Sequence, residues 1–133
     1  MLDIYIDADG CPVKDEVYRV ARRHGLKTYV VSNSYMSVPL DDKIEQVVVG
    51  SRFDAADDWI AERIGKGDVA ITADIPLAAR CLEKGAQAIS PKGHPFTEDS
   101  IGDVLASREL MSQLRQAGVV IGDPAPMAKP DKS

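Results

Sequence analysis

The sequence predicts an α/β fold, in which helices cover both faces of a central, mainly parallel sheet of about five strands. Short apolar runs rich in β-branched residues alternate with amphipathic helical segments along most of the 133 residues. Such alternation is typical of parallel strands joined by right-handed crossovers. The length and the 44% hydrophobic content are those of one globular domain with its own core.

The first predicted strand runs from residue 4 into an acidic pair, Asp7 and Asp9. Period-2 strand geometry points both carboxylates to the same side. Gly10 permits a sharp exit, and Pro12 suits the first turn of a helix. Ligands of open α/β sheets bind at this carboxyl edge. Because two like charges repel, the pair favours a shared proton or a cation such as Mg²⁺ or Mn²⁺; two solvated turn acids are the alternative.

A helix is predicted next, from Pro12 to His24. Its apolar residues recur at i, i+4, i+7 and i+8, and Gly25 closes it. Strands are predicted over residues 26–31 and 44–49, where β-branched and aromatic residues gather.

The helix predicted over residues 55–64 carries an acid within its apolar face. At roughly 100° per residue, Ile60 and Ile64 lie within about 60° of Asp57, which therefore points toward the sheet. Asp54 is the candidate cap. Complementing the helix dipole would also explain Asp57. An unpaired carboxylate on a buried face is costly, however, which argues for a functional role.

A strand over residues 69–73 leads directly into Asp74, which occupies the N-cap position of a helix with Pro76 in its first turn. This helix is expected to end near Gly85, and the last strand covers residues 86–89. Capping alone would explain Asp74. It is nevertheless another acid at the carboxyl end of a strand.

The strand order 3-2-1-4-5 puts the first strand at the centre. It gathers four acids at one edge of the sheet: Asp7, Asp9, Asp57 and Asp74. Polar residues in loops at the same edge are candidate substrate contacts: Ser32, Asn33 and Lys92. Ordinary turn and surface roles are the alternative for these three residues.

A final helix is predicted from Thr97 to about Ala117, with a possible bend at Ser107. We expect a single domain over residues 1–122 and a flexible C-terminal tail over residues 123–133, where proline and charged residues dominate.

The net charge of -5 and the pI of about 4.9 argue against a broad, electrostatically driven nucleic-acid surface. They do not exclude a metal-dependent nuclease, because cations can bridge an acidic site to phosphate. Basic residues gather around the end of the first helix, where they complement the helix dipole. No signal peptide or membrane span is visible, and two cysteines are too few for a disulfide framework, so we expect a cytoplasmic location.

Three motifs resemble the YaiI/YqxD family. They are Ile-Asp-Ala-Asp-Gly-Cys-Pro-Val at residues 6–13, Gly-Asp-Val-Ala-Ile-Thr-Ala-Asp-Ile-Pro-Leu-Ala at residues 67–78, and Ser-Pro-Lys-Gly at residues 90–93. The family is biochemically uncharacterised, and its fold is similar to that of the PIN-like nucleases. The resemblance implies a three-layer α/β/α domain whose clustered acids bind Mg²⁺ or Mn²⁺. Gly10 stands where alanine is usual and Lys92 where arginine is usual; neither change removes a candidate ligand.

The first functional hypothesis is a metal-dependent ribonuclease. Asp7, Asp9, Asp57 and Asp74 would be both its catalytic residues and the ligands of one or two cations, which would stabilise the charge on the transferring phosphoryl group.

Two alternatives remain open. A phosphatase resembling the haloacid dehalogenases would use Asp7 as nucleophile, Asp9 as acid/base, Ser32 for phosphate and Asp68 or Asp74 for Mg²⁺. Its helical turn and hairpin are not expected here, because a regular helix follows at once. The other alternative is a non-catalytic domain that binds RNA or a protein partner, including a second copy of the chain.

Overall fold

The computed structural model describes residues 2–11, 13–52, 54–96 and 105–122. Within these residues it confirms the α/β class, with five strands and four α-helices that alternate except between β2 and β3, where no helix intervenes. The strands are β1 (Asp3–Asp7), β2 (Lys27–Ser32), β3 (Ile44–Val48), β4 (Val69–Ile71) and β5 (Gln87–Ile89). The helices are α1 (Lys14–His24), α2 (Ala55–Arg63), α3 (Ile75–Glu83) and α4 (Leu105–Gly122), with a short 3-10 turn, η1 (Ala8–Gly10), after β1.

The sheet has the predicted order β3-β2-β1-β4-β5, and all four strand pairings are parallel. In the central strand, Ile4 lies opposite Thr28 of β2 and Val69 of β4. The ends of β1 and β4 are therefore neighbours, and so are the segments that leave them.

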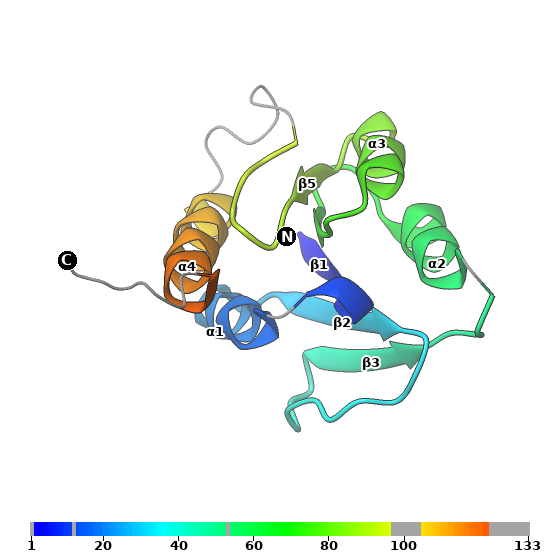
Figure 1. The fold of residues 1–133 in the computed structure, drawn as a ribbon, viewed down its shortest axis with the longest axis horizontal. Coiled ribbons are helices and arrows are strands. Elements are labelled where there is room, and N and C mark those ends of the chain that lie inside the picture. The colour runs from blue at the N-terminus through cyan, green and yellow to red at the C-terminus, as the bar shows by residue number, and fades with distance from the viewer. Residues whose placement is uncertain (1, 12, 53, 97–104, 123–133) are drawn as a thin grey trace.

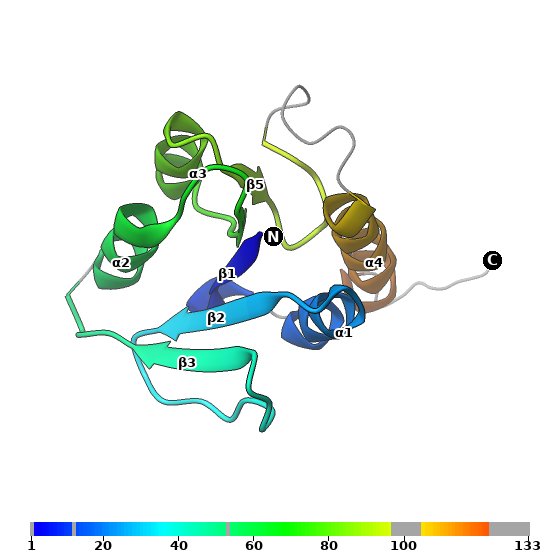
Figure 2. The ribbon, with the colours of Figure 1, turned by 180° about the vertical axis from the view of Figure 1, so that it is seen from behind.

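The helices form one layer on each face of the sheet (Figure 1). Helices α1 and α4 lie together on one face and α2 and α3 on the other, and the reverse view shows the same separation (Figure 2). The alternation of side chains along each strand explains the two layers. In β1, Ile4 and Ile6 join the core beneath α1 and α4, while Tyr5 joins the core beneath α2 and α3.

Most of the predicted helix and strand boundaries differ from the observed ones by only a few residues. Helix α1 begins at Lys14, and its predicted start at Pro12 lies outside the described residues. The carboxyl-terminal boundary of β2 was predicted one residue too early, since Ser32 is the last residue of this strand and not part of a loop. Conversely, β4 ends at Ile71, two residues before its predicted end.

The last helix differs more from its prediction. Helix α4 runs without interruption from Leu105 to Gly122, so it continues past the predicted bend at Ser107 and beyond the predicted end. The buried Ser107 hydroxyl donates to Gln87 Oε1 at 2.6 Å, which ties α4 to β5. The predicted helical start over residues 97–104 and the predicted tail over residues 123–133 lie outside the described residues.

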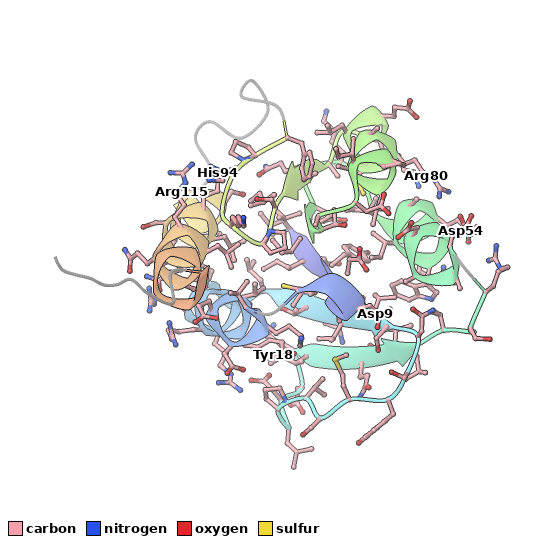
Figure 3. The ribbon with its side chains drawn as sticks, viewed as in Figure 1. Asp9, Tyr18, Asp54, Arg80, His94 and Arg115 are labelled. Atoms are coloured by element: carbon pink, nitrogen blue, oxygen red, sulfur yellow. The ribbon has the colours of Figure 1, made fainter. Side chains whose placement is uncertain are left out.

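A return segment, Ser90–Phe96, folds back along β5. Its backbone pairs Ile89 with Pro95 in antiparallel fashion, and Phe96 N donates to Ala88 O at 3.0 Å. Gly93 has φ +87°, and a Cβ built there would lie 2.3 Å from Met111 O of α4. Only glycine therefore lets the segment approach the helix this closely. Figure 3 shows His94 and Arg115 together on this side of the molecule.

The two cysteines are free and buried, Cys11 in the core beneath α1 and α4 and Cys81 in the opposite core. Within the described residues, the structure contains no helix whose length and apolar character would let it cross a membrane.

Candidate functional site

Thr72 joins two of the predicted acids where β1 and β4 end. The Thr72 hydroxyl donates to Asp7 Oδ2 at 2.9 Å and accepts from the backbone N–H of Asp74 at 3.0 Å. Asp74 Oδ1 in turn accepts from Leu77 N at 2.8 Å, which confirms Asp74 as the N-cap of α3. Thr72 is almost completely buried. The position of Asp7 relative to Asp74 is therefore fixed by strand pairing, one hydroxyl and one helix cap.

Asp57 points toward this pair from the first turn of α2, as its helical position predicted. Burial, followed by the charges of Asp74 and Asp7, raises the pKa of Asp57 to about 6. The nearby Asp74 side chain contributes further to this rise. The sequence prediction that an acid of α2 faces the sheet edge is thus confirmed, whereas Asp54 occupies the cap position without a side-chain cap bond.

Asp7 is partly buried at the end of β1. Burial raises its pKa, the hydrogen bond from Thr72 opposes that rise, and the charges of Asp9 and Asp74 add to it. Asp7, Asp57 and Asp74 therefore interact electrostatically as one group, which we call the acidic triad.

Asp9 does not share a strand with Asp7, so the period-2 argument for this pair is wrong. The strand ends at Asp7 because Ala8–Gly10 turn into η1, whose end is closed by Cys11 N donating to Ala8 O. Asp9 is exposed on this turn (Figure 3) and accepts from Asn33 N at 3.1 Å. It remains close enough to influence Asp7 through its charge.

The three predicted substrate contacts differ in accessibility. Ser32 is fully buried, and its hydroxyl donates to Ser34 O at 2.6 Å, so it is not presented to a ligand. Asn33 is exposed, and its side-chain amide donates to Gly50 O at 3.0 Å. Lys92 is exposed on the return segment. Nothing in the described part of the chain pairs Lys92 with the acidic triad.

The acidic triad has no cationic partner among the described residues. In every ion pair between described residues, the acidic partner is a residue outside the triad. Asp58, the next residue after Asp57, pairs with both Arg52 and Arg80 at 2.9 Å. The basic residues near the end of α1 are also paired: Arg22 with Asp41, Arg23 and His24 with Glu109, and Lys27 with Glu45.

The triad offers the oxygen donors and the unbalanced negative charge that suit Mg²⁺ or Mn²⁺. In the described residues, however, no three acidic, histidine or cysteine side chains lie close enough together to hold one ion. The predicted cage of four acids is therefore not assembled in this conformation. The proximity of Asp57 to Asp74 instead fits a site of two carboxylates completed by water and a substrate phosphate, which is common for Mg²⁺.

Sequence reasoning missed the role of Thr72. The available signal was a polar, β-branched residue directly after a buried strand and two positions before an acid.

The phosphatase alternative loses one of its candidate ligands, because Asp68 precedes β4 and lies at the opposite edge of the sheet. Its carboxylate accepts from Asp3 N and Gly65 N, both at 2.9 Å.

Comparison with known proteins gives a consistent family assignment. A family model described as "Uncharacterized BCR, YaiI/YqxD family" matches residues 5–133. A UPF0178 protein of Rhodopseudomonas palustris (strain BisB18) is 54% identical over 130 residues, which cover 98% of this chain and 84% of the relative. A UPF0178 protein of Azorhizobium caulinodans is 54% identical over 132 residues, covering 99% and 83% of the two chains.

Proposed function

The chain belongs to the YaiI/YqxD family, and from this premise and the acidic triad we propose that it is a Mg²⁺- or Mn²⁺-dependent ribonuclease that hydrolyses phosphodiester bonds. One observation carries the proposal. Three carboxyls from β1, α2 and the α3 cap influence one another electrostatically at the carboxyl edge of a parallel sheet, and within the described residues they have no cation to balance them. The cost of assembling these charges is a reason to expect a ligand that offsets it.

In this proposal, Asp57 and Asp74 would hold the cation. When bound, it would supply Lewis-acid stabilisation of the charge on the phosphoryl group. Asp7 contributes a separate function. Thr72 holds Asp7 Oδ2 at 2.9 Å, which leaves Asp7 Oδ1 to orient the attacking water and accept its proton.

The surface charge supports a local mode of substrate binding. The net charge is -5, and the basic residues near α1 are engaged in ion pairs, so long-range attraction of RNA is weak. A cation bound at the triad would attract the phosphate groups of RNA directly at the site of cleavage. The free, buried thiols suit a reducing compartment such as the cytoplasm, where we place the activity.

Cleavage of a 5′-labelled single-stranded RNA oligonucleotide tests the proposal. Wild-type protein is expected to cleave with Mn²⁺ or Mg²⁺ and to stop when EDTA is added. Asp7→Asn keeps the shape of the side chain and should lower the rate by roughly a hundredfold or more, because the proton acceptor is lost. Glu83→Gln, at the exposed end of α3, is the control and should leave the rate nearly unchanged.

Equal loss in Asp7→Asn and Glu83→Gln would contradict the assignment of the triad, since only one of these carboxyls belongs to it. No cleavage by wild-type protein at millimolar Mn²⁺, with correctly folded material, would contradict the nuclease proposal itself. A non-catalytic role in binding RNA or a protein partner would then be the favoured hypothesis.

A further inference from the structure

We propose that a pocket between the end of β3 and α2 binds a nucleobase, and that it is the subsite for a nucleotide next to the bond that the triad cleaves. The second part of this inference rests on the proposed function, whereas base binding does not. The pocket has a volume of about 440 Å³, within the range of small-molecule sites. Its lining includes Val47, Val49, Arg52, Trp59, Glu62 and Arg63.

Trp59 provides an aromatic surface held in place from behind. Its ring centroid lies 5.7 Å from that of Tyr29 and 6.2 Å from that of Tyr5, and the two tyrosines stack on one another at 4.9 Å. The Arg63 guanidinium lies 4.4 Å from the Trp59 centroid. A planar cation on an indole ring shows that this surface accepts flat, polar groups, and a nucleobase is another such group.

The charged groups of the pocket favour a base over a bare phosphate. Two arginines, Arg52 and Arg63, are balanced by Asp58 and Glu62. Arg52 is already committed to Asp58 at 2.9 Å. Glu62 has an exposed carboxylate whose contact with Arg63 is long, at 3.7 Å, so it can accept hydrogen bonds from the N–H groups of a base. A pocket with acceptors and donors but little net charge suits a base edge.

Asn33 connects the pocket with the carboxyl edge of the sheet. Its side-chain amide donates to Gly50 O of the pocket wall, and its backbone N–H donates to Asp9, whose charge acts on Asp7 of the triad. A nucleotide whose base enters the pocket would therefore hold its phosphate near the triad.

Trp59 is the only tryptophan in the chain, so intrinsic tryptophan fluorescence reports this pocket directly. Full-length protein in EDTA is titrated with GMP, AMP, UMP, a hexa-adenylate and inorganic phosphate. We expect saturable quenching by the purine monophosphates, weaker quenching by UMP because its stacking surface is smaller, and none by phosphate. Tighter binding of hexa-adenylate than of AMP would identify an RNA strand as the source of the base, and equal binding would identify a free nucleotide.

Calorimetry of pocket variants shows where the nucleotide binds, and this method does not depend on the environment of the tryptophan. Glu62→Gln and Arg63→Met are expected to weaken AMP and GMP binding by roughly five- to tenfold, as loss of one hydrogen-bonding or stacking group predicts. Glu83→Gln, at the exposed end of α3, is the matched control and should bind like wild type. Both pocket side chains are at the surface, so these variants should fold.

Quenching by phosphate alone, no binding of any nucleotide, or wild-type affinity in both pocket variants would overturn the proposal. Asp57→Asn separates this proposal from the nuclease: it should lose cleavage and keep nucleotide binding. Binding without any cleavage by wild-type protein would sustain the base pocket and contradict the nuclease. Cleavage with unchanged KM in the pocket variants would sustain the nuclease and overturn the subsite.

Discussion

Asp57 and Asp58 are adjacent residues on different sides of α2, and the pKa values of their carboxyls shift in opposite directions. On the outer side, hydrogen bonds from Arg80 and Arg52 hold the pKa of Asp58 below its usual value. On the inner side, burial and the charges of Asp74 and Asp7 raise the pKa of Asp57 to about 6. Figure 3 shows Arg80 on α3, directed toward the outer side of α2.

The difference separates a carboxyl whose charge is balanced from one whose charge is not. Asp58 links two helices through two arginines, and its charge is fully balanced. Asp57 has the same chemistry but no cationic partner within the described residues, and it lies near two further acids. The side of the helix, and not the residue type, therefore distinguishes a candidate functional acid from a structural one.

Metal binding gives the largest expected difference between the two sides. Asp57→Asn should weaken Mn²⁺ binding, measured by calorimetry, by about a hundredfold. Mutation of residues that only hydrogen-bond to metal ligands already lowers metal affinity by about ten- to a hundredfold, and Asp57 is proposed as a ligand itself. Asp58→Asn should bind Mn²⁺ within about twofold of wild type. Similar affinities in the two variants would remove the distinction drawn here.

Thr72 connects the triad, and its removal should be the most destabilising of the changes considered. In Thr72→Val the shape is retained, but Asp7 loses a donor and the Asp74 N–H loses an acceptor. The free energy of unfolding, measured in urea at pH 7.5, should fall by about 2 kcal/mol. Thr72→Ser keeps the hydroxyl and should recover most of the loss; if it does not, packing of the methyl group is the dominant contribution.

Asp74 combines a helix cap with a charge of the triad, and two variants separate these roles. Asp74→Asn retains a good cap and should leave stability close to wild type while weakening Mn²⁺ binding. Asp74→Ala also loses the bond to Leu77 N and should cost about 1 kcal/mol in urea unfolding. Equal stability of the two variants would show that the cap contributes little.

The pH dependence of stability should have opposite signs on the two sides of α2. The folded-state pKa of Asp57 is raised from 3.8 to about 6, so its favourable contribution is complete below pH 4 and is lost as the pH rises through 6. Metal-free Asp57→Asn should therefore be more stable than wild type at pH 7.5, by roughly 1 kcal/mol once solvent screening is allowed for.

Asp58 provides the comparison in the same urea experiment. Its folded-state pKa is lowered, so its contribution is present above its unfolded pKa and is lost as the pH falls. Asp58→Asn should be slightly less stable than wild type at pH 7.5. A destabilised Asp57→Asn at that pH would contradict the proposed repulsion within the triad.

Much of the fold and part of the site could be predicted from periodicity. The parallel sheet followed from the alternation of elements, and its strand order from placing the acidic end of the first strand at the centre. The inward direction of Asp57 followed from the 100° turn per residue, and the cap at Asp74 from its place before Pro76. Asp9 was misplaced because strand periodicity was extended across a 3-10 turn, which carries no apolar signal of its own. Thr72 acts through a contact between residues 65 apart in sequence, and such contacts leave no local pattern.

The return segment has a consequence for how copies of this protein can associate. It lies along β5, and the pyrrolidine nitrogen of Pro95 has no hydrogen to offer an incoming strand. The other end of the sheet is β3. At β5, in contrast, Phe96 N already donates to Ala88 O, so this part of the edge is covered. Addition of a strand from a second copy is therefore disfavoured at this part of β5, as at other sheet edges that carry proline or are covered by a loop.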